Sequence, residues 1–207
     1  MTRIETNRLR LVPIIEEDIP AVAEFFLQLN LDKKFTKMAW GQEEPIHATL
    51  EEVTNRAVQW KEAFEKFGMG WYFVRLRETQ EPIGYVFIRP VLESQLQYTR
   101  DSHPEVDPAT FQARPGEIEL GYGFATVAWG KGYATEAVRR ILDHGFQNLN
   151  VPFISGAALT DNVGSQKVME KAGMTEIKSG GPSYYGVEDK YYEMTRKQWE
   201  QKEAHSL

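Results

Sequence analysis

A turn at residues 129–134 contains the residue types that could bind a phosphate. It reads Trp-Gly-Lys-Gly-Tyr-Ala and lies between a short alternating segment, 117–124, and an amphipathic helical pattern. The first N–H groups of a helix have no acceptor within the helix, and the helix dipole adds positive potential there. Gly130 and Gly132 carry no Cβ that would keep a phosphate away. The turn therefore predicts an anion site, although two glycines also suit a simple chain reversal.

A carboxylate in the preceding segment, Glu119, is a candidate for proton transfer. Glu117 and Glu119 are two residues apart in an expected strand, so their side chains point to the same face. A carboxylate can take a proton from an amine, directly or through water. The alternative is that both are solvated acids on a strand surface. Gly121 and Gly123, further along this strand, indicate a bulge or a close approach of another backbone.

A second polar motif follows at residues 161–165, which read Asp-Asn-Val-Gly-Ser and precede a helical pattern that ends at Gly173. Asn162 and Ser165 are residue types that cap helices. They could also bind a ligand, and both uses can coexist. Lys167 adds a positive charge one turn into this helix.

Other nucleotide-binding motifs do not fit the glycine turn. A dinucleotide-binding fingerprint needs a third glycine where Thr135 stands, and a P-loop needs Ser or Thr after its lysine, where Lys131 is followed by Gly132. These departures disfavour both kinds of site.

The elements that must position these residues follow an irregular order. Hydrophobic periodicity predicts strands at 8–13, 71–77, 83–89, 117–124, 153–158, 174–178 and 190–195, and helices at 17–29, 49–67, 132–148, 165–172 and from 196. Residues 30–47 are expected to be a loop, 92–115 a long surface insertion that contains His103, and 179–186 a loop that contains Tyr184 and Tyr185. This order predicts a mixed α/β or α+β layer in one domain, residues 1–207.

Composition narrows the kinds of partner. The 24 basic and 30 acidic residues give a net charge of −6, which disfavours a broad nucleic-acid surface and suits a cationic substrate. The absence of cysteine excludes thiolate metal ligands and Cys nucleophiles, so any thiol in the chemistry must come from a cofactor. No segment approaches the roughly 18 apolar residues of a membrane span, and a cytoplasmic protein is expected.

Two longer motifs carry a family resemblance. Residues 129–137 after Glu-Leu-Gly-Tyr, followed by Asn-Val-Gly-Ser-Gln-Lys-Val-Met-Glu-Lys-Ala-Gly-Met at 162–174, resemble the acetyl-CoA-binding core of the GNAT acetyltransferases. The opening residues 6–11 and the closing Asp189 and 192–195 are similar to the Rim-type branch, the ribosomal-protein N-terminal acetyltransferases. The resemblance covers the chain outside 92–115. It implies a GNAT fold, with a mixed, mostly antiparallel, twisted sheet splayed in the middle and helices on both faces.

The resemblance implies acetyl-CoA as co-substrate and no metal. It places the pyrophosphate on the amides from Gly130 to Ala134 and the pantetheine arm beside Phe124 to Val127. The implied cofactor-binding residues are Phe124, Ala125, Thr126, Val127, Trp129, Gly130, Lys131, Gly132, Tyr133, Ala134, Asn162, Ser165 and Lys167. Trp129 stands where the wider superfamily often has Arg or Gln, and packing is an alternative use for it.

The resemblance also implies direct attack of an amine on the thioester, with no enzyme nucleophile. Glu119 matches the family's strand glutamate and would accept the proton of the amine. Many members have a tyrosine general acid where Met169 stands, so Ser165, with or without water, is the candidate that protonates the leaving thiolate.

The expected function is N-acetylation of a primary amine. The acceptor is either a protein N-terminal α-amine or a small-molecule amine, with no nucleic-acid or membrane partner, and the enzyme is expected to be a monomer or homodimer. From another class of protein, the alternative is an acyl-CoA sensor or interaction module without turnover.

Overall fold

A computed structural model of the chain describes residues 4–92, 114–182 and 188–204. The expected insertion, with His103, falls almost wholly outside these residues, as do Tyr184 and Tyr185. The elements in chain order are β1 (Ile4–Glu5), β2 (Leu9–Pro13), η1 (Ile14–Glu16), α1 (Ile19–Leu31), α2 (Lys33–Trp40), α3 (Leu50–Phe67), β3 (Trp71–Leu76), β4 (Pro82–Pro90), β5 (Ile118–Phe124), η3 (Thr126–Ala128), α5 (Tyr133–Gln147), β6 (Phe153–Leu159), α6 (Val163–Ala172), β7 (Thr175–Pro182), β8 (Glu188–Thr195) and α7 (Arg196–Ala204). Within the described part of the chain, no helix has the length and apolar composition needed to cross a membrane.

The strands form one sheet in the order β1-β2-β3-β4-β5-β6-β8-β7. Every neighbouring pair is antiparallel except β5 and β6, which run parallel. These two strands pair only at Ile118 with Ile154 and at Glu119 with Ser155. Beyond that point β5 stays paired with β4 as far as Phe124, so the two halves of the sheet separate. The predicted fold class, a mixed and mostly antiparallel sheet, is confirmed.

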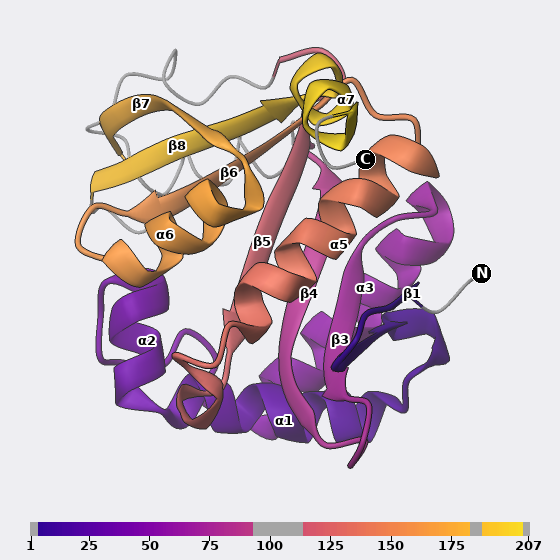
Figure 1. Cartoon of the computed structure of the whole chain (residues 1–207). Coiled ribbons are helices and arrows are strands. Elements are labelled where there is room, and N and C mark those ends of the chain that lie inside the picture. The colour runs from indigo at the N-terminus through magenta and orange to yellow at the C-terminus, as the bar shows by residue number, and fades with distance from the viewer. Residues whose placement is uncertain (1–3, 93–113, 183–187, 205–207) are drawn as a thin grey trace.

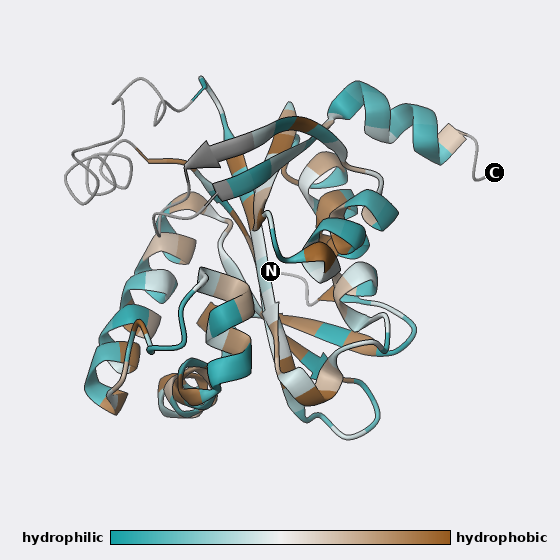
Figure 2. Cartoon of the chain, turned by 90° about the vertical axis from the view of Figure 1, so that its left-hand side faces the viewer, coloured by the Kyte–Doolittle hydropathy of each residue, from teal (hydrophilic) through white to brown (hydrophobic). Residues whose placement is uncertain are grey.

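Helices cover both faces of this sheet (Figure 1). Seen edge-on, the helices turn their apolar sides toward the strands and their polar sides outward (Figure 2). On the α5 face, Gly145 lets the helix approach so closely that a Cβ there would lie within 2.8 Å of Ile88 and Ile154. Helices α1 and α3 cover the opposite face.

An aromatic cluster fills the space under α1 and α3. The Phe26 ring stacks on Tyr85 with centroids 4.8 Å apart, and Trp60 stacks on Trp71 at 4.0 Å. Phe87 joins the cluster through Trp71, with centroids 4.6 Å apart. Aromatic pairs at these separations add stability beyond the area that they bury. The cluster fixes β3 and β4 to α1 and α3.

Gly121 and Gly123 serve a different purpose from the one expected. The β4 and β5 pairing is regular through both residues, so there is no bulge, and side chains approach these glycines instead of a backbone. A Cβ on Gly121 would lie 2.2 Å from the Phe87 ring, and one on Gly123 would lie 2.6 Å from the Tyr85 ring. The two glycines accommodate the aromatic rings of the neighbouring strand.

The expectation of a loop at residues 30–47 was wrong for its central part, because α2 lies there. Asp32 caps this helix by accepting hydrogen bonds from the N–H groups of Lys34 and Phe35, and Gly41 ends it in the left-handed conformation. Phe35 is buried at one turn of this short amphipathic helix. Asp32 and Gly41 are residue types that begin and end helices. Because only about two turns of helix lie between them, the periodic signal was weak.

Gly121→Ala tests the ring contact. Replacing a glycine in a strand stabilises a protein by up to about 1 kcal/mol through the unfolded chain. Overpacking against the Phe87 ring costs roughly 1–3 kcal/mol, so we expect net destabilisation, measured by urea unfolding. In a Phe87→Leu background the same change should cost less. Gly164→Ala, where a Cβ would make an ordinary 3.5 Å contact with Asn162 Oδ1, is the matched control. Equal costs in both backgrounds would contradict this explanation.

Candidate active site

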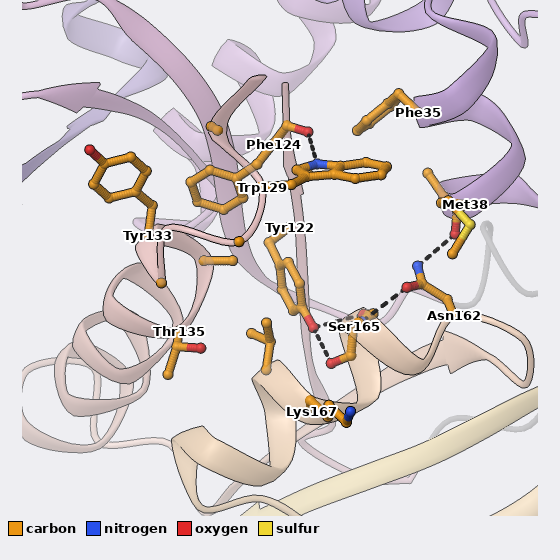
Figure 3. Close-up of a pocket in the computed structure, with 18 of the residues that line it drawn as sticks. Phe35, Met38, Tyr122, Phe124, Trp129, Tyr133, Thr135, Asn162, Ser165 and Lys167 are labelled. Carbon is orange, nitrogen blue, oxygen red and sulfur yellow. Dashed lines mark hydrogen bonds between the residues drawn. The ribbon is translucent and has the colours of Figure 1, made fainter. Parts of the chain in front are cut away.

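A pocket of about 430 Å³ lies where β5 leaves β6. Figure 3 shows side chains from β5, the turn after it, α6 and α2 gathered around it. Its walls come from residues far apart in the sequence. They include Phe35 and Met38 on α2, Tyr122 and Phe124 on β5, most residues of 129–135 and several residues of 162–171. The gap between the two strands therefore becomes a cavity bounded by two helix N-termini.

The glycine turn forms one end of the pocket. Gly130 and Gly132 have φ values of 74° and 78°, in the left-handed region that favours glycine. Gly132 is the N-cap of α5 and no side chain caps this helix, whose first backbone bond runs from the N–H of Glu136 to the Gly132 carbonyl. The N–H groups of Tyr133, Ala134 and Thr135 precede that bond, and all three residues line the pocket. The arrangement can accept an anion.

The glycines are required here by backbone conformation. A Cβ on Gly130 would meet no atom of the protein within 4 Å, so there is room for a side chain. A non-glycine residue in the left-handed region costs roughly 1–2 kcal/mol, which is the larger effect. The left-handed backbone is thus a reason for glycine at both positions beyond the missing Cβ, and their role in binding a phosphate stays a prediction.

An N-terminal brace holds the first turn of α5. Glu136 accepts hydrogen bonds from Thr6 Oγ1 at 2.5 Å, from the Arg8 N–H at 3.0 Å and from Arg8 Nε at 2.7 Å. The Arg8 guanidinium also donates to the Lys131 carbonyl at 2.9 Å and lies 4.6 Å from the centre of the Tyr133 ring. The segment at residues 6–8 thereby positions the glycine turn, and Arg8 brings positive charge to it.

Trp129 packs as an anchor at the pocket edge. Its indole Nε1 donates to the Phe124 carbonyl at 2.7 Å, and Lys34 Nζ lies 5.3 Å from its ring centre. The neighbouring Ala125 N–H donates to the Ile83 carbonyl on β4. The Phe124 carbonyl and the Ala125 N–H, which belong to the expected pantetheine segment, are therefore already hydrogen-bonded within the protein. The role of residues 124–127 beside pantetheine stays a prediction.

Asn162 links α6 to α2. Its Oδ1 accepts from the Ser165 N–H at 3.0 Å, which caps the helix as expected. Its Nδ2 donates to the Met38 carbonyl at 2.6 Å. Thr126 Oγ1 donates to Asp32 at 2.8 Å, so α2 is tied to both sides of the pocket mouth.

Ser165 lies at the base of the pocket against a tyrosine. The Tyr122 hydroxyl is 2.7 Å from Ser165 Oγ and 2.9 Å from the Ser165 carbonyl (Figure 3). Burial raises the pKa of Tyr122 above its ordinary value, so the phenol stays protonated at neutral pH. Tyr122 lines the pocket and was not among the site residues predicted from the sequence. Its two-residue spacing from Phe124 was the signal, because both side chains share one face of β5.

Glu119 is held on the opposite face of β5 by an ion pair. Arg89 Nε and Nη2 both donate to Glu119 Oε2, at 3.0 and 2.8 Å. Glu117 accepts from Ser155 Oγ at 2.8 Å and from the Arg114 N–H at 2.9 Å. Neither acid lines the pocket. Glu119 on β5 and Glu117, directly before this strand, both have hydrogen-bond partners, and the role of Glu119 as base stays a prediction.

The other predicted residues divide into two groups. Phe124, Trp129, Gly130, Gly132, Tyr133, Ala134, Asn162, Ser165 and Lys167 line the pocket, whereas Ala125, Thr126, Val127 and Lys131 do not. Lys171 also lines it, one helical turn after Lys167. Both lysines are exposed at the surface of α6, where they can attract an anionic ligand. Across residues 4–92, 114–182 and 188–204, no three His, Cys, Asp or Glu side chains are grouped to hold a metal ion.

The fold and the pocket combine three features. The mixed sheet is open, it splits between β5 and β6, and a glycine turn with an uncapped helix N-terminus lies beside the split. Residues 8–175 match the family described as "Acetyltransferase (GNAT) domain", so the chain belongs to the GNAT acetyltransferases and is an acyltransferase. Acetyl-CoA-dependent transfer of an acetyl group to an amine is general to this family.

Individual relatives are distant. The FsC-acetyl coenzyme A-N(2)-transacetylase of Aspergillus fumigatus is 26% identical over 203 residues, covering 95% of this chain and 77% of that protein. The ribosomal-protein-S5-alanine acetyltransferase of Vibrio fischeri superposes with a TM-score of 0.69 at 17% identity, covering 96% of this chain and 99% of that one. The aminoglycoside acetyltransferase AAC(6')-Ib, in complex with coenzyme A, gives 0.65 at 19% identity, covering 94% and 98%. At these identities the structures show a shared fold.

The brace at Glu136 leads to a pH prediction. Burial would raise the pKa of Glu136, but the bonds from Thr6 and Arg8 lower it overall. The carboxylate therefore stabilises the fold above the unfolded pKa of about 4.3, and this stability is lost as the pH falls through the lower folded pKa. We expect Glu136→Gln to lower the melting temperature at pH 7 and to differ less from wild type below about pH 4. Glu62→Gln, on the exposed side of α3, is the control and should show no such trend.

Proposed function

We propose that this chain is an N-acetyltransferase that binds acetyl-CoA in the pocket between β5 and β6 and transfers its acetyl group directly to a primary amine. The observation that carries the proposal is the end of the pocket, where an uncapped α5 N-terminus follows two left-handed glycines. Such a turn offers several N–H donors to the pyrophosphate. Lys167 and Lys171 on the facing helix supply charge for the other phosphates.

The two faces of β5 suit the two proton movements of the reaction. The nitrogen–carbon bond forms while the carbon–sulfur bond breaks, the amine loses a proton, and the sulfur leaves with the electron pair. Glu119 lies on the α1 and α3 side of β5, with Oε1 outside its ion pair to Arg89, and would take the amine proton directly or through water. On the other side of β5, beside Ser165, the thiolate would take up a proton from the serine or from water. The amine and the sulfur would thus meet across the gap between the strands.

The acceptor is an N-terminal α-amine of a protein or a small-molecule amine. The resemblance of residues 6–11 and 192–195 to the Rim-type branch favours the protein substrate. A small-molecule amine is the second acceptor class, because the same fold is found in an aminoglycoside acetyltransferase at 19% identity. Phe35 and Met38 on α2 give the mouth of the pocket an apolar side on which an acceptor could pack. The proposal also includes a single domain, a monomeric or homodimeric assembly and a cytoplasmic location.

An acyl-CoA sensor without turnover is the alternative, and a panel assay distinguishes the two. The purified chain is incubated with acetyl-CoA and with N-terminal peptides beginning with Ala, Ser or Met, or with polyamines, amino acids or aminoglycosides, and thiol release is followed by a colorimetric reagent. We expect release with one acceptor class above the rate without acceptor. Tight binding of CoA by calorimetry with no release for any acceptor would favour the sensor.

Glu119→Gln tests the base. With the acceptor that the panel identifies, we expect kcat to fall by roughly 10²–10⁴-fold, because general base catalysis contributes about that much. Acetyl-CoA affinity should stay within about twofold, since Glu119 does not line the pocket. Glu117→Gln, two residues away on the same face, is the matched control and should retain most turnover. An unchanged kcat in Glu119→Gln would remove this residue from the mechanism.

A further inference from the structure

We propose that Tyr122 is a catalytic residue that donates a hydrogen bond to the departing sulfur, with Ser165 holding its hydroxyl in place. This inference rests on the proposed function. Tyr122 projects from β5 into the pocket at the place where β5 and β6 have just separated, and its hydroxyl reaches the first turn of α6. Figure 3 shows the ring crossing the pocket between the glycine turn and Ser165.

The proton count of the two hydroxyls supports this role. Tyr122 Oη and Ser165 Oγ, 2.7 Å apart, carry one proton each, and the Ser165 carbonyl 2.9 Å from Oη can only accept. One of the two hydroxyls donates within the pair. The proton of the other is directed to the carbonyl or to a new acceptor in the pocket. The pair therefore has one proton to offer to a ligand without losing the bond between its members.

The phenol is the better donor of the two. A phenol has an ordinary pKa near 10, whereas an aliphatic hydroxyl does not titrate in the accessible range, so the phenol donates more strongly to an anion. Ser165 donates its backbone N–H to Asn162, which positions the serine, and its carbonyl accepts the Tyr122 proton only until a ligand atom takes that hydrogen bond. The serine fixes the tyrosine, and the tyrosine faces the ligand.

The helix cannot supply a phenol of its own. Met169, which stands where many members of the family have a tyrosine, is 1% exposed and belongs to the hydrophobic core. Its sulfur would lie 3.3 Å from a Cβ placed on Gly156, which shows how closely it packs against β6. A strand residue, 43 positions before Ser165, provides the hydroxyl at this place instead.

The step is a hydrogen bond with no complete proton transfer from the tyrosine. As the carbon–sulfur bond breaks, the electron pair moves onto sulfur and the Tyr122 O–H bonds to it. Burial raises the pKa of Tyr122, while a thiol titrates near 8.5, so full transfer would be unfavourable. The thiolate takes its proton from water on release, and the amine proton leaves through the base or water. Charge and atoms balance without a net change at Tyr122.

Binding of CoA and desulfo-CoA, which lacks the sulfur, tests this role without any acceptor. Calorimetry from pH 6.5 to 9.5 follows the ratio of the two affinities as the thiol ionises. For wild type we expect the ratio to rise in favour of CoA by about 10- to 100-fold, the range expected for a hydrogen bond to a charged group. In Tyr122→Phe, which keeps the ring, this rise should disappear while desulfo-CoA affinity changes less than about twofold.

The outcomes separate the possible failures. If wild type binds neither compound, the proposed donor site is wrong. If it binds both with a ratio that does not change with pH, the inference about Tyr122 is overturned whether or not the variant folds. A ratio that rises equally in Tyr122→Phe but not in Ser165→Ala would assign the donor to Ser165 and also overturn it. With an identified acceptor, Tyr122→Phe should lower kcat about 10- to 100-fold with KM for acetyl-CoA little changed.

Discussion

The separation of β5 from β6 after two residue pairs is the constraint on which the site depends. Both strands remain fixed by their other neighbours, β5 by β4 as far as Phe124 and β6 by β8 as far as Leu159. Closing the gap would break one of these ladders, so the pocket is built into the sheet. At the point of divergence, Gly156 is so close to β5 that a Cβ there would lie 3.2 Å from the Leu120 carbonyl. A ligand can use the polar backbone beyond that point.

The aromatic cluster keeps one wall of this gap rigid. Phe87 and Tyr85 cover Gly121 and Gly123, so β5 is held against β4 by ring contacts as well as hydrogen bonds. Because side chains alternate along β5, this packing also directs Tyr122 and Phe124 to the other face, toward α6. A carboxylate and a phenol are therefore separated by the sheet itself, with Glu119 beside Arg89 on one face and the Tyr122 hydroxyl on the other.

Local signals in the sequence were sufficient for most elements and for the glycine turn at one end of the pocket. The capping box of Thr49 and Glu52 and the left-handed Gly68 and Gly173 are set by residues close in sequence, and the helices that they bound were predicted at 49–67 and 165–172. Long-range pairs could not be predicted in the same way. The partners Arg89 of Glu119 and Ser165 of Tyr122 depend on strand register and on where a helix packs, and no short motif encodes either. Helix α2 was missed because eight residues give a weak periodic signal.

The hydrogen bonds of α2 connect the two sides of the pocket, at Thr126 and at Asn162. Asp32 caps α2 and at the same time accepts from Thr126, just before the glycine turn. At the other end, Asn162 caps α6 and donates to the Met38 carbonyl. The same side chains thus cap the N-termini of α2 and α6 and fix α2 at the mouth of the pocket. A movement of α2 would break or stretch the hydrogen bonds of Asp32 with Thr126 and of Met38 with Asn162. The position of α2 is therefore physically coupled to the geometry of both sides of the pocket, because one set of side chains holds all three.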